Sequence, residues 1–89
     1  MKADSLNPFG KRLKQARITR GLSQKQLGIQ AGIDQFVASA RMNQYEKNVH
    51  IPNFATVYHI ATVLNLPTAY FFCIEDDLAE HILEWTKQQ

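Results

Sequence analysis

The feature that most restricts the fold of this chain is a pair of short helices that meet at a glycine turn. Ser23 and Gln26 are spaced as a capping box, in which each side chain bonds the other residue's backbone amide at a helix start. Gly32 suits the end of that helix, because glycine adopts the left-handed conformation without strain. Asp34 is a good cap for the next helix, so only Gly32 and Ile33 separate the two. Two helices joined this tightly predict helix-turn-helix geometry.

Other capping signals divide the rest of the chain into helices, so we expect an all-α fold. Asn7 and Pro8 suit a helix start, and Gly21 suits its end. Asn53 and Asn65 have the same two roles around a later helix. The helices that we expect span residues 7–20, 23–31, 34–45, 53–64, 67–72 and 75–89.

Two positions inside this pattern predict specific backbone features. Gly28 lies inside the second helix, where glycine costs about 1 kcal/mol relative to alanine, so we expect a neighbouring helix to approach it closely. Asn48 follows the third helix, and asparagine tolerates the left-handed conformation best after glycine. We therefore expect a left-handed residue in the loop at Asn48.

Composition limits the function classes that remain. An 89-residue chain makes one domain with a small core. Cys73 is its only cysteine, so no disulfide can form within the chain, and with no signal peptide in the sequence we expect a cytoplasmic protein. No apolar run is long enough to cross a bilayer, so we expect no membrane partner.

The charges are divided unevenly along the chain. Residues 1–47 hold nine Lys and Arg against three acidic residues, whereas residues 48–89 hold one Lys against five acidic residues. A basic half joined to an acidic half favours a polyanion partner at one end. A charged surface that only faces solvent is the alternative, because the basic excess is modest.

Several segments together carry a resemblance to a known family. They are RLKQARITRGLSQKQLGIQAGI (12–33), YEKN (45–48), IP (51–52) and HIATVLNLPTAYFF (59–72). On these segments the chain resembles the Cro/C1-type helix-turn-helix DNA-binding proteins. The resemblance implies an all-α, five-helix, lambda-repressor-like domain in residues 1–74, followed by an additional C-terminal amphipathic helix of the same domain in residues 75–89. It also implies a transcriptional regulator, acting as a repressor, that binds double-stranded DNA.

The chain departs from the family pattern between Gly32 and Glu46, where it is four residues longer. Four residues turn an α-helix by about 400° and lengthen it by about 6 Å, so the inward and outward faces are nearly kept. The resemblance implies that the third helix is the recognition helix, which reads the DNA major groove, so we expect an extended recognition helix over residues 34–45. The side chains expected to pack on the core are Ala38, Met42 and Tyr45.

The opposite side of this helix carries side chains suited to reading bases. Asn and Gln amides pair with adenine, serine bonds several bases, arginine bonds guanine or a phosphate, and Phe or Ala contacts a thymine methyl. The candidate DNA-binding residues on this helix are Gln35, Phe36, Ser39, Ala40, Arg41, Asn43 and Gln44. The alternative is that Phe36 packs on a neighbour and that the amides only face water.

The resemblance implies roles for five further residues. Gln24 matches a glutamine that contacts a phosphate and braces the recognition helix, the alternative being a plain surface glutamine. Lys47 and Asn48 match the loop that meets the DNA backbone, although Asn48 replaces the usual glycine. Arg17 and Glu46 match a structural ion pair that joins the first and third helices.

The sequence lacks the spacings typical of an enzyme, a metal site or a cofactor site. His50, His59 and His81 have no metal-ligand spacing with one another or with Cys73, and no glycine-rich phosphate loop is present. We therefore expect no catalysis, no metal and no cofactor. Two other binding functions stay open: the antitoxin of a toxin–antitoxin pair, and an adaptor that binds a protein partner through its acidic C-terminal helix.

The C-terminal helix has an apolar stripe, Leu78, Ile82 and Trp85, on an acidic background. A helix this short is marginal alone in water, so it needs a surface to pack on. That surface is either its own five-helix body or a second subunit. We expect a homodimer with these three residues as candidate contacts, because paired half-sites add specificity.

Overall fold

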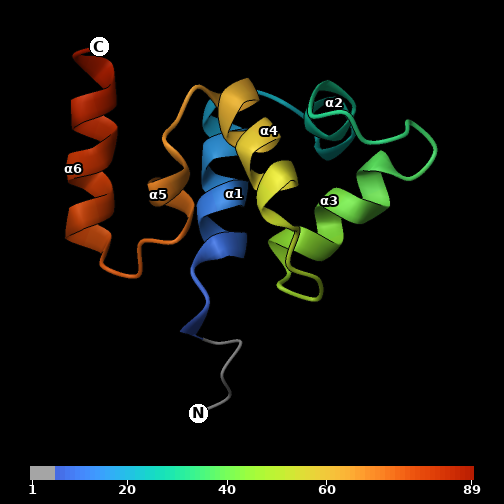
Figure 1. Cartoon of the computed structure of the whole chain (residues 1–89), viewed down its shortest axis with the longest axis horizontal. Helices are drawn as coiled ribbons and strands as arrows, with labels where there is room; N and C mark the ends of the chain where they lie inside the picture. The colour runs from blue at the N-terminus through green and yellow to red at the C-terminus, as the bar shows by residue number, and fades with distance from the viewer. Residues whose placement is uncertain (1–5) are drawn as a thin grey trace.

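The protein is all-α in residues 6–89, the part that its computed structural model describes (Figure 1). Its helices are α1 (Phe9–Thr19), α2 (Gln24–Gln30), α3 (Ala38–Glu46), α4 (Phe54–Leu64), α5 (Thr68–Phe71) and α6 (Asp76–Lys87). This arrangement confirms the predicted fold class, a five-helix body with an additional C-terminal helix.

The predicted caps form around α1 and α2. Asn7 Oδ1 accepts a hydrogen bond of 3.0 Å from the first backbone N–H of α1. Ser23 Oγ accepts from the Gln26 N–H at 3.0 Å and Gln26 Oε1 accepts from the Ser23 N–H at 2.8 Å, so the capping box is complete. Gly21 and Gly32, with φ of 71° and 92°, end the two helices in the left-handed conformation. These caps set the short connection between α1 and α2, and α2 then packs on α3 and α4.

One hydrophobic core joins α1 to α5. Its largest fully buried side chains are Phe9, Phe71, Leu13, Leu27, Met42, Ile60, Leu64 and Val57. The rings of Phe9 and Phe71 lie 5.9 Å apart, centre to centre, so the start of α1 is packed against α5. The core therefore holds α1 between α3 and α5, which lie on opposite sides of it in Figure 1.

The third helix begins at Ala38, so the prediction of a continuous helix over residues 34–45 is wrong. Asp34 caps only one turn, in which its Oδ1 accepts from the Phe36 N–H at 2.8 Å and its carbonyl oxygen accepts from the Val37 N–H at 3.1 Å. At Val37 φ is −119°, far from the value of about −63° in a regular helix. The extra residues therefore form a turn that exposes Phe36, not an added turn of α3.

The C-terminal helix α6 lies at the end of the molecule opposite α3 (Figure 1). Its first residue, Asp76, accepts hydrogen bonds of 3.0 Å from both Lys11 Nζ and Arg12 Nη2. These two bonds, with the Lys11 bond first in effect, lower the pKa of Asp76 below its ordinary value. Ala79 is buried, Ile82 is half-buried against the core, and the other two residues of the predicted stripe, Leu78 and Trp85, are exposed.

Candidate nucleic-acid interface

Close packing of α2 on α3 fixes the orientation of the third helix. A Cβ added to Gly28 would lie 2.8 Å from Ala38 Cβ and 3.1 Å from the Ala38 carbonyl oxygen. Only glycine leaves room for the α3 backbone there, which confirms the close approach predicted at Gly28. Because Ala38 is fully buried at this contact, it also determines where α3 begins.

A buried carboxylate connects α1, α2 and α3. Glu46, whose side chain is 4% exposed, accepts hydrogen bonds from Arg17 Nε at 2.5 Å and Arg17 Nη2 at 3.1 Å. Gln24 Nε2 donates to Glu46 Oε1 at 3.1 Å and to Asn43 Oδ1 at 3.2 Å. Charge-assisted, bidentate bonds of this kind are strong and directional. The network therefore holds the side chain of Asn43 on α3, and Gln24 is braced against α3 through its amide nitrogen.

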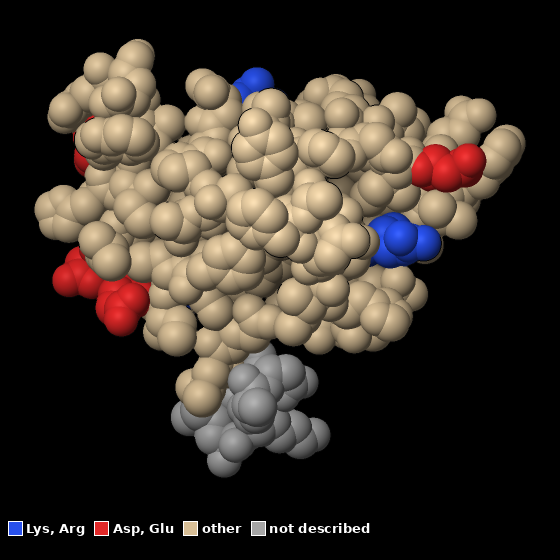
Figure 2. All heavy atoms as spheres, in the orientation of Figure 1, with Lys and Arg blue, Asp and Glu red and all other residues tan. Residues whose placement is uncertain are grey.

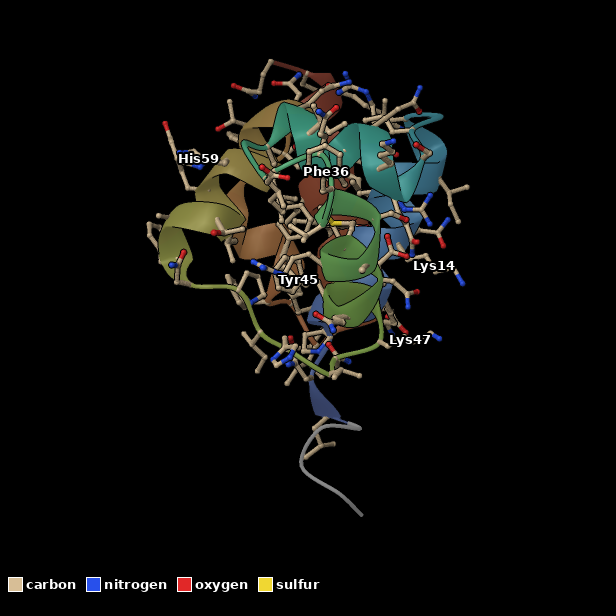
Figure 3. All side chains as sticks on the ribbon, turned by 90° about the vertical axis from the view of Figure 1, so that its right-hand side faces the viewer. Lys14, Phe36, Tyr45, Lys47 and His59 are labelled. Carbon is tan, nitrogen blue, oxygen red and sulfur yellow. The ribbon has the colours of Figure 1, made fainter. Side chains whose placement is uncertain are left out.

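The outer side of α3 faces the viewer in Figure 3, with α2 beside it. Of the candidates predicted on this segment, Gln35, Phe36, Ser39, Ala40 and Arg41 are exposed, and Asn43 and Gln44 are half-buried. Phe36 is 88% exposed, so the alternative in which it packs on a neighbouring helix is wrong. Arg41 and Gln44 line a hollow between α3 and the start of α4, which His50 and Asn53 complete. The structure thus gathers polar, aromatic and basic side chains on one outer face.

The two residues after α3 have different environments. Lys47 is exposed (Figure 3). Asn48 has φ of 57°, which confirms the predicted left-handed residue. Its Oδ1 accepts from the Gly10 N–H at 3.0 Å and its Nδ2 donates to the Asn7 carbonyl oxygen at 3.2 Å. The side chain of Asn48 therefore fastens the loop to the start of α1, a contact that no sequence pattern indicated.

A further basic residue lies near this face. Lys14 on α1 is exposed and lies on the same side of the molecule as Lys47 in Figure 3. Lys14 falls three residues before Arg17, and residues three apart on a helix share a face. Since Arg17 contacts the end of α3, that spacing was the signal that could have placed Lys14 here.

Charged side chains are distributed unevenly over the surface. In the view of Figure 2, acidic side chains appear at the α6 end and, beside a basic side chain, at the α3 end, and the broad face between the two ends carries almost no charged side chain. Residues 48–74, which include α4 and α5, contain no Lys, Arg, Asp or Glu. The separation of charge along the chain is only partial in space, because Lys11 and Arg12 of the basic half pair with Asp76 of α6.

The described residues contain neither a candidate metal centre nor a candidate membrane span. Within residues 6–89, no three His, Cys, Asp or Glu side chains come together as metal ligands. No helix in that range is both long enough and apolar enough to cross a membrane.

Comparisons with known proteins agree with this geometry. A family model described as a helix-turn-helix domain matches residues 10–73. The crystal structure of the transcriptional regulator BswR is 56% identical and superposes with a TM-score of 0.85, covering 88% of this chain and 77% of that one. The search of curated proteins found no match. The chain belongs to the Cro/C1-type (XRE-like) helix-turn-helix family.

Proposed function

We propose that this protein is a transcriptional regulator, acting as a repressor, that binds specific sequences of double-stranded DNA through the outer face of α3. The observation that carries the proposal is this exposed polar face, held against α1 and α2 by the buried carboxylate of Glu46. The protein bound at its DNA site then blocks access of polymerase to the promoter. The resemblance to BswR, which is called a transcriptional regulator, supports the same function.

The residues of the face have separate roles in this proposal. Ser39, Arg41 and Gln44 read base edges in the major groove, and Asn43, held by Gln24, reads a base from a fixed position. Phe36 extends from the turn before α3 to contact a thymine methyl, with Gln35 and Ala40 beside it. Lys47 and Lys14 neutralise phosphates and fix the register without reading sequence.

Selection of binding sites from random DNA, followed by mutation, tests this division of roles. Gln44→Ala is expected to reduce affinity for the selected site about five- to hundredfold and to flatten the preference at one base position. Lys47→Ala, the control, is expected to weaken all sequences alike and to reduce the slope of log affinity against log salt by about one. Absence of DNA binding at low salt, or an affinity that does not change with salt, would exclude the proposed function.

The position of α6 restricts how two such units can pair on DNA. The outer side of α6 lies opposite α3, so a two-fold dimer through that side would turn the two α3 faces away from each other (Figure 1). Both faces meet one DNA duplex only when the subunits pair through a lateral surface. One such surface is the face over α4, which carries almost no charged side chain in Figure 2 and which we call the uncharged face. It is lateral because α4 lies beside α3 when α3 faces the viewer (Figure 3).

The side chains on this lateral face favour a second copy of the chain as its partner. Phe54 and Tyr58 of α4 are 69% and 56% exposed, and Trp85 of α6 is 54% exposed. Trp85 lines one hollow with Ala61 and Pro67, so the α6 stripe continues onto the α4 side. Interface centres are depleted in charge and enriched in aromatic residues. We therefore place the homodimer contact on α4 and Trp85.

Light scattering on two matched variants tests the contact. Tyr58→Glu places a charge on the uncharged face and is expected to give a folded monomer with weakened operator binding. Ile18→Glu replaces another exposed apolar residue, 53% exposed on α1, and is expected to leave the dimer intact. A wild type that is monomeric at micromolar concentration, or a Tyr58→Glu variant that remains dimeric, would refute this contact.

A further inference from the structure

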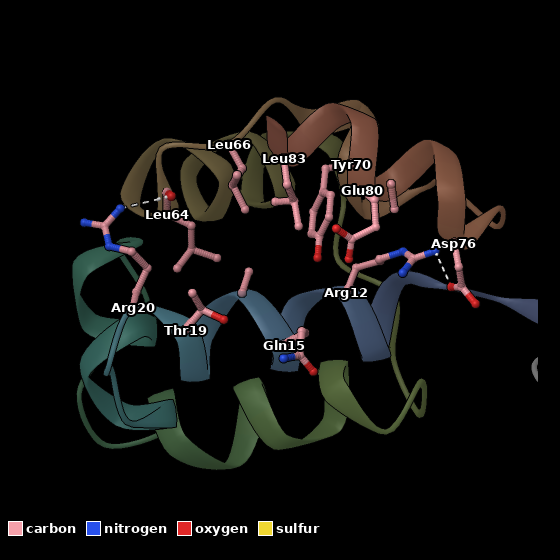
Figure 4. A pocket seen from close by; sticks show the side chains of 12 residues that line it. Arg12, Gln15, Thr19, Arg20, Leu64, Leu66, Tyr70, Asp76, Glu80 and Leu83 are labelled. Carbon is pink, nitrogen blue, oxygen red and sulfur yellow. Dashed lines mark hydrogen bonds and ion pairs between the residues drawn. The ribbon is translucent and has the colours of Figure 1, made fainter. Parts of the chain in front are cut away.

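A groove between α1 and α6 is separate from the proposed DNA-binding face. It has a volume of about 370 Å³ and is floored by the α4–α5 connection (Figure 4). Small-molecule sites usually occupy about 300–1,000 Å³. The hydrogen bond from Arg12 Nη2 to Asp76 lies at one end, and the bond of 3.0 Å from Arg20 Nη1 to the Leu64 carbonyl oxygen lies at the other. The groove is thus a bounded space between fixed elements.

Its two walls have different chemistry. Leu64, Leu66 and Leu83 supply apolar surface from α4, the α4–α5 connection and α6. The α1 wall carries Gln15 and Thr19, both exposed, four residues apart on one face. Water in such a groove faces leucine side chains to which it cannot hydrogen-bond, so a ligand with an apolar body gains by displacing it.

One buried polar group opens onto the groove. Tyr70 is 2% exposed, yet its hydroxyl has no hydrogen-bond partner among residues 6–89, and no polar side-chain atom there is both fully buried and unpaired. The hydroxyl oxygen therefore reaches the groove surface, where Figure 4 shows it directed toward α1, beside the Glu80 carboxylate. Burial, the largest effect, raises the pKa of Tyr70, so the group keeps its proton and can donate at neutral pH.

The charges around the groove do not favour an ion of either sign. Arg12 donates to the Cys73 and Ile74 carbonyl oxygens and to Asp76, so its guanidinium is already bonded. Arg20 and Glu80 complete a set of two basic and two acidic side chains at the rim. An uncharged ligand loses the least hydration on entering such a site.

From these observations we infer that the groove binds a small uncharged molecule with an aromatic or alicyclic body and one hydrogen-bond acceptor, which takes the Tyr70 hydroxyl proton in a hydrogen bond. The body lies against Leu64, Leu66 and Leu83. A ligand in this position touches α1 on one side and α6 on the other, and it therefore stabilises the position of α6. This inference does not depend on DNA binding.

The probe for the test is acetophenone, which has one aromatic ring and one carbonyl acceptor, titrated into the isotope-labelled full chain without DNA and followed by NMR. Saturable shifts at the amides of Ala16, Thr19 and Leu83 are expected. Benzoate and benzylammonium, of similar size but charged, are expected to bind at least threefold more weakly. Absence of saturation, shifts confined to another surface, or tighter binding of either ion would overturn the inference.

Three variants distinguish binding in the groove from non-specific binding to other surfaces. Tyr70→Phe removes only the hydroxyl and is expected to weaken acetophenone about three- to tenfold. Thr19→Trp fills the groove from an exposed position and is expected to abolish the shifts, whereas Gln30→Trp, also at an exposed position but on α2, is expected to leave them unchanged. Equal affinity of the wild type and Tyr70→Phe would show that the Tyr70 hydroxyl does not bond the probe. Binding that persists in Thr19→Trp would show that the probe binds outside the groove.

Discussion

Glu46 connects three helices through a single carboxylate, and its removal should affect both stability and DNA binding. Glu46→Ala leaves Arg17, whose side chain is 13% exposed, without its carboxylate partner and removes one of the two bonds of the Gln24 amide. Breaking a buried ion pair costs about 3–5 kcal/mol, so we expect the free energy of unfolding to fall by about 3 kcal/mol in urea titrations.

An exposed pair provides the control for this measurement. Glu84 and Lys87 form an ion pair of 3.3 Å on α6, with side chains 61% and 72% exposed. Exposed pairs contribute little, so Glu84→Ala should change the free energy of unfolding by less than about 0.5 kcal/mol. Equal losses in the two variants would show that burial of Glu46 does not strengthen its pair.

Phe36 is expected to show the opposite combination, a loss of function without a loss of stability. Its side chain is 88% exposed on the turn before α3, so Phe36→Ala should change the free energy of unfolding by less than about 0.5 kcal/mol. Affinity for the selected DNA site should fall about five- to tenfold, because an apolar contact with a thymine methyl is lost. Fluorescence anisotropy measures the affinity, and an unchanged value would remove Phe36 from the interface.

Residue patterns predicted the backbone better than they predicted side-chain partners. The capping box at Ser23 and the left-handed residue at Asn48 depend on neighbours in the sequence, and both are present. The bonds from the Asn48 side chain to the start of α1 join residues that are far apart in the sequence. No local pattern encodes such a contact, so the role of Asn48 in bracing the loop could not be predicted.

At the scale of elements, the contact between α2 and α3 decides the geometry of the reading face. Gly28→Ala in an ordinary helix would stabilise by about 1 kcal/mol. Here the new Cβ would overlap with the backbone and Cβ of Ala38, so we expect a loss of about 2 kcal/mol instead. Gln30→Ala, exposed on the same helix, is the control and should stay within about 0.5 kcal/mol. Urea unfolding measures the free energy of unfolding of both variants. A Gly28→Ala variant more stable than the wild type would mean that α3 can move away from α2 without cost.

The same contact explains why the length of α3 was predicted wrongly. The expected helix over residues 34–45 assumed that extra residues continue the helical period. In the folded protein, Ala38 must lie against Gly28, and that contact fixes the first residue of α3 wherever the preceding chain begins. The period predicted Ala38, Met42 and Tyr45 as core residues correctly, because these positions lie within the helix that forms.

At the scale of the whole molecule, the lateral position of the uncharged face has a consequence for the DNA that the dimer recognises. Two α3 helices related by a two-fold axis should read an inverted repeat whose half-sites lie on the same side of the double helix, one turn apart. Five added base pairs move the second half-site to the opposite side of the duplex, so affinity should fall to that of an isolated half-site. Ten added base pairs return the second half-site to the same side of the duplex but double its distance from the first. A rigid dimer can therefore still contact only one half-site at a time. Gel shifts compare the affinity for the original operator with the affinities for the two lengthened ones. Equal affinity for all three would mean that each subunit binds DNA independently.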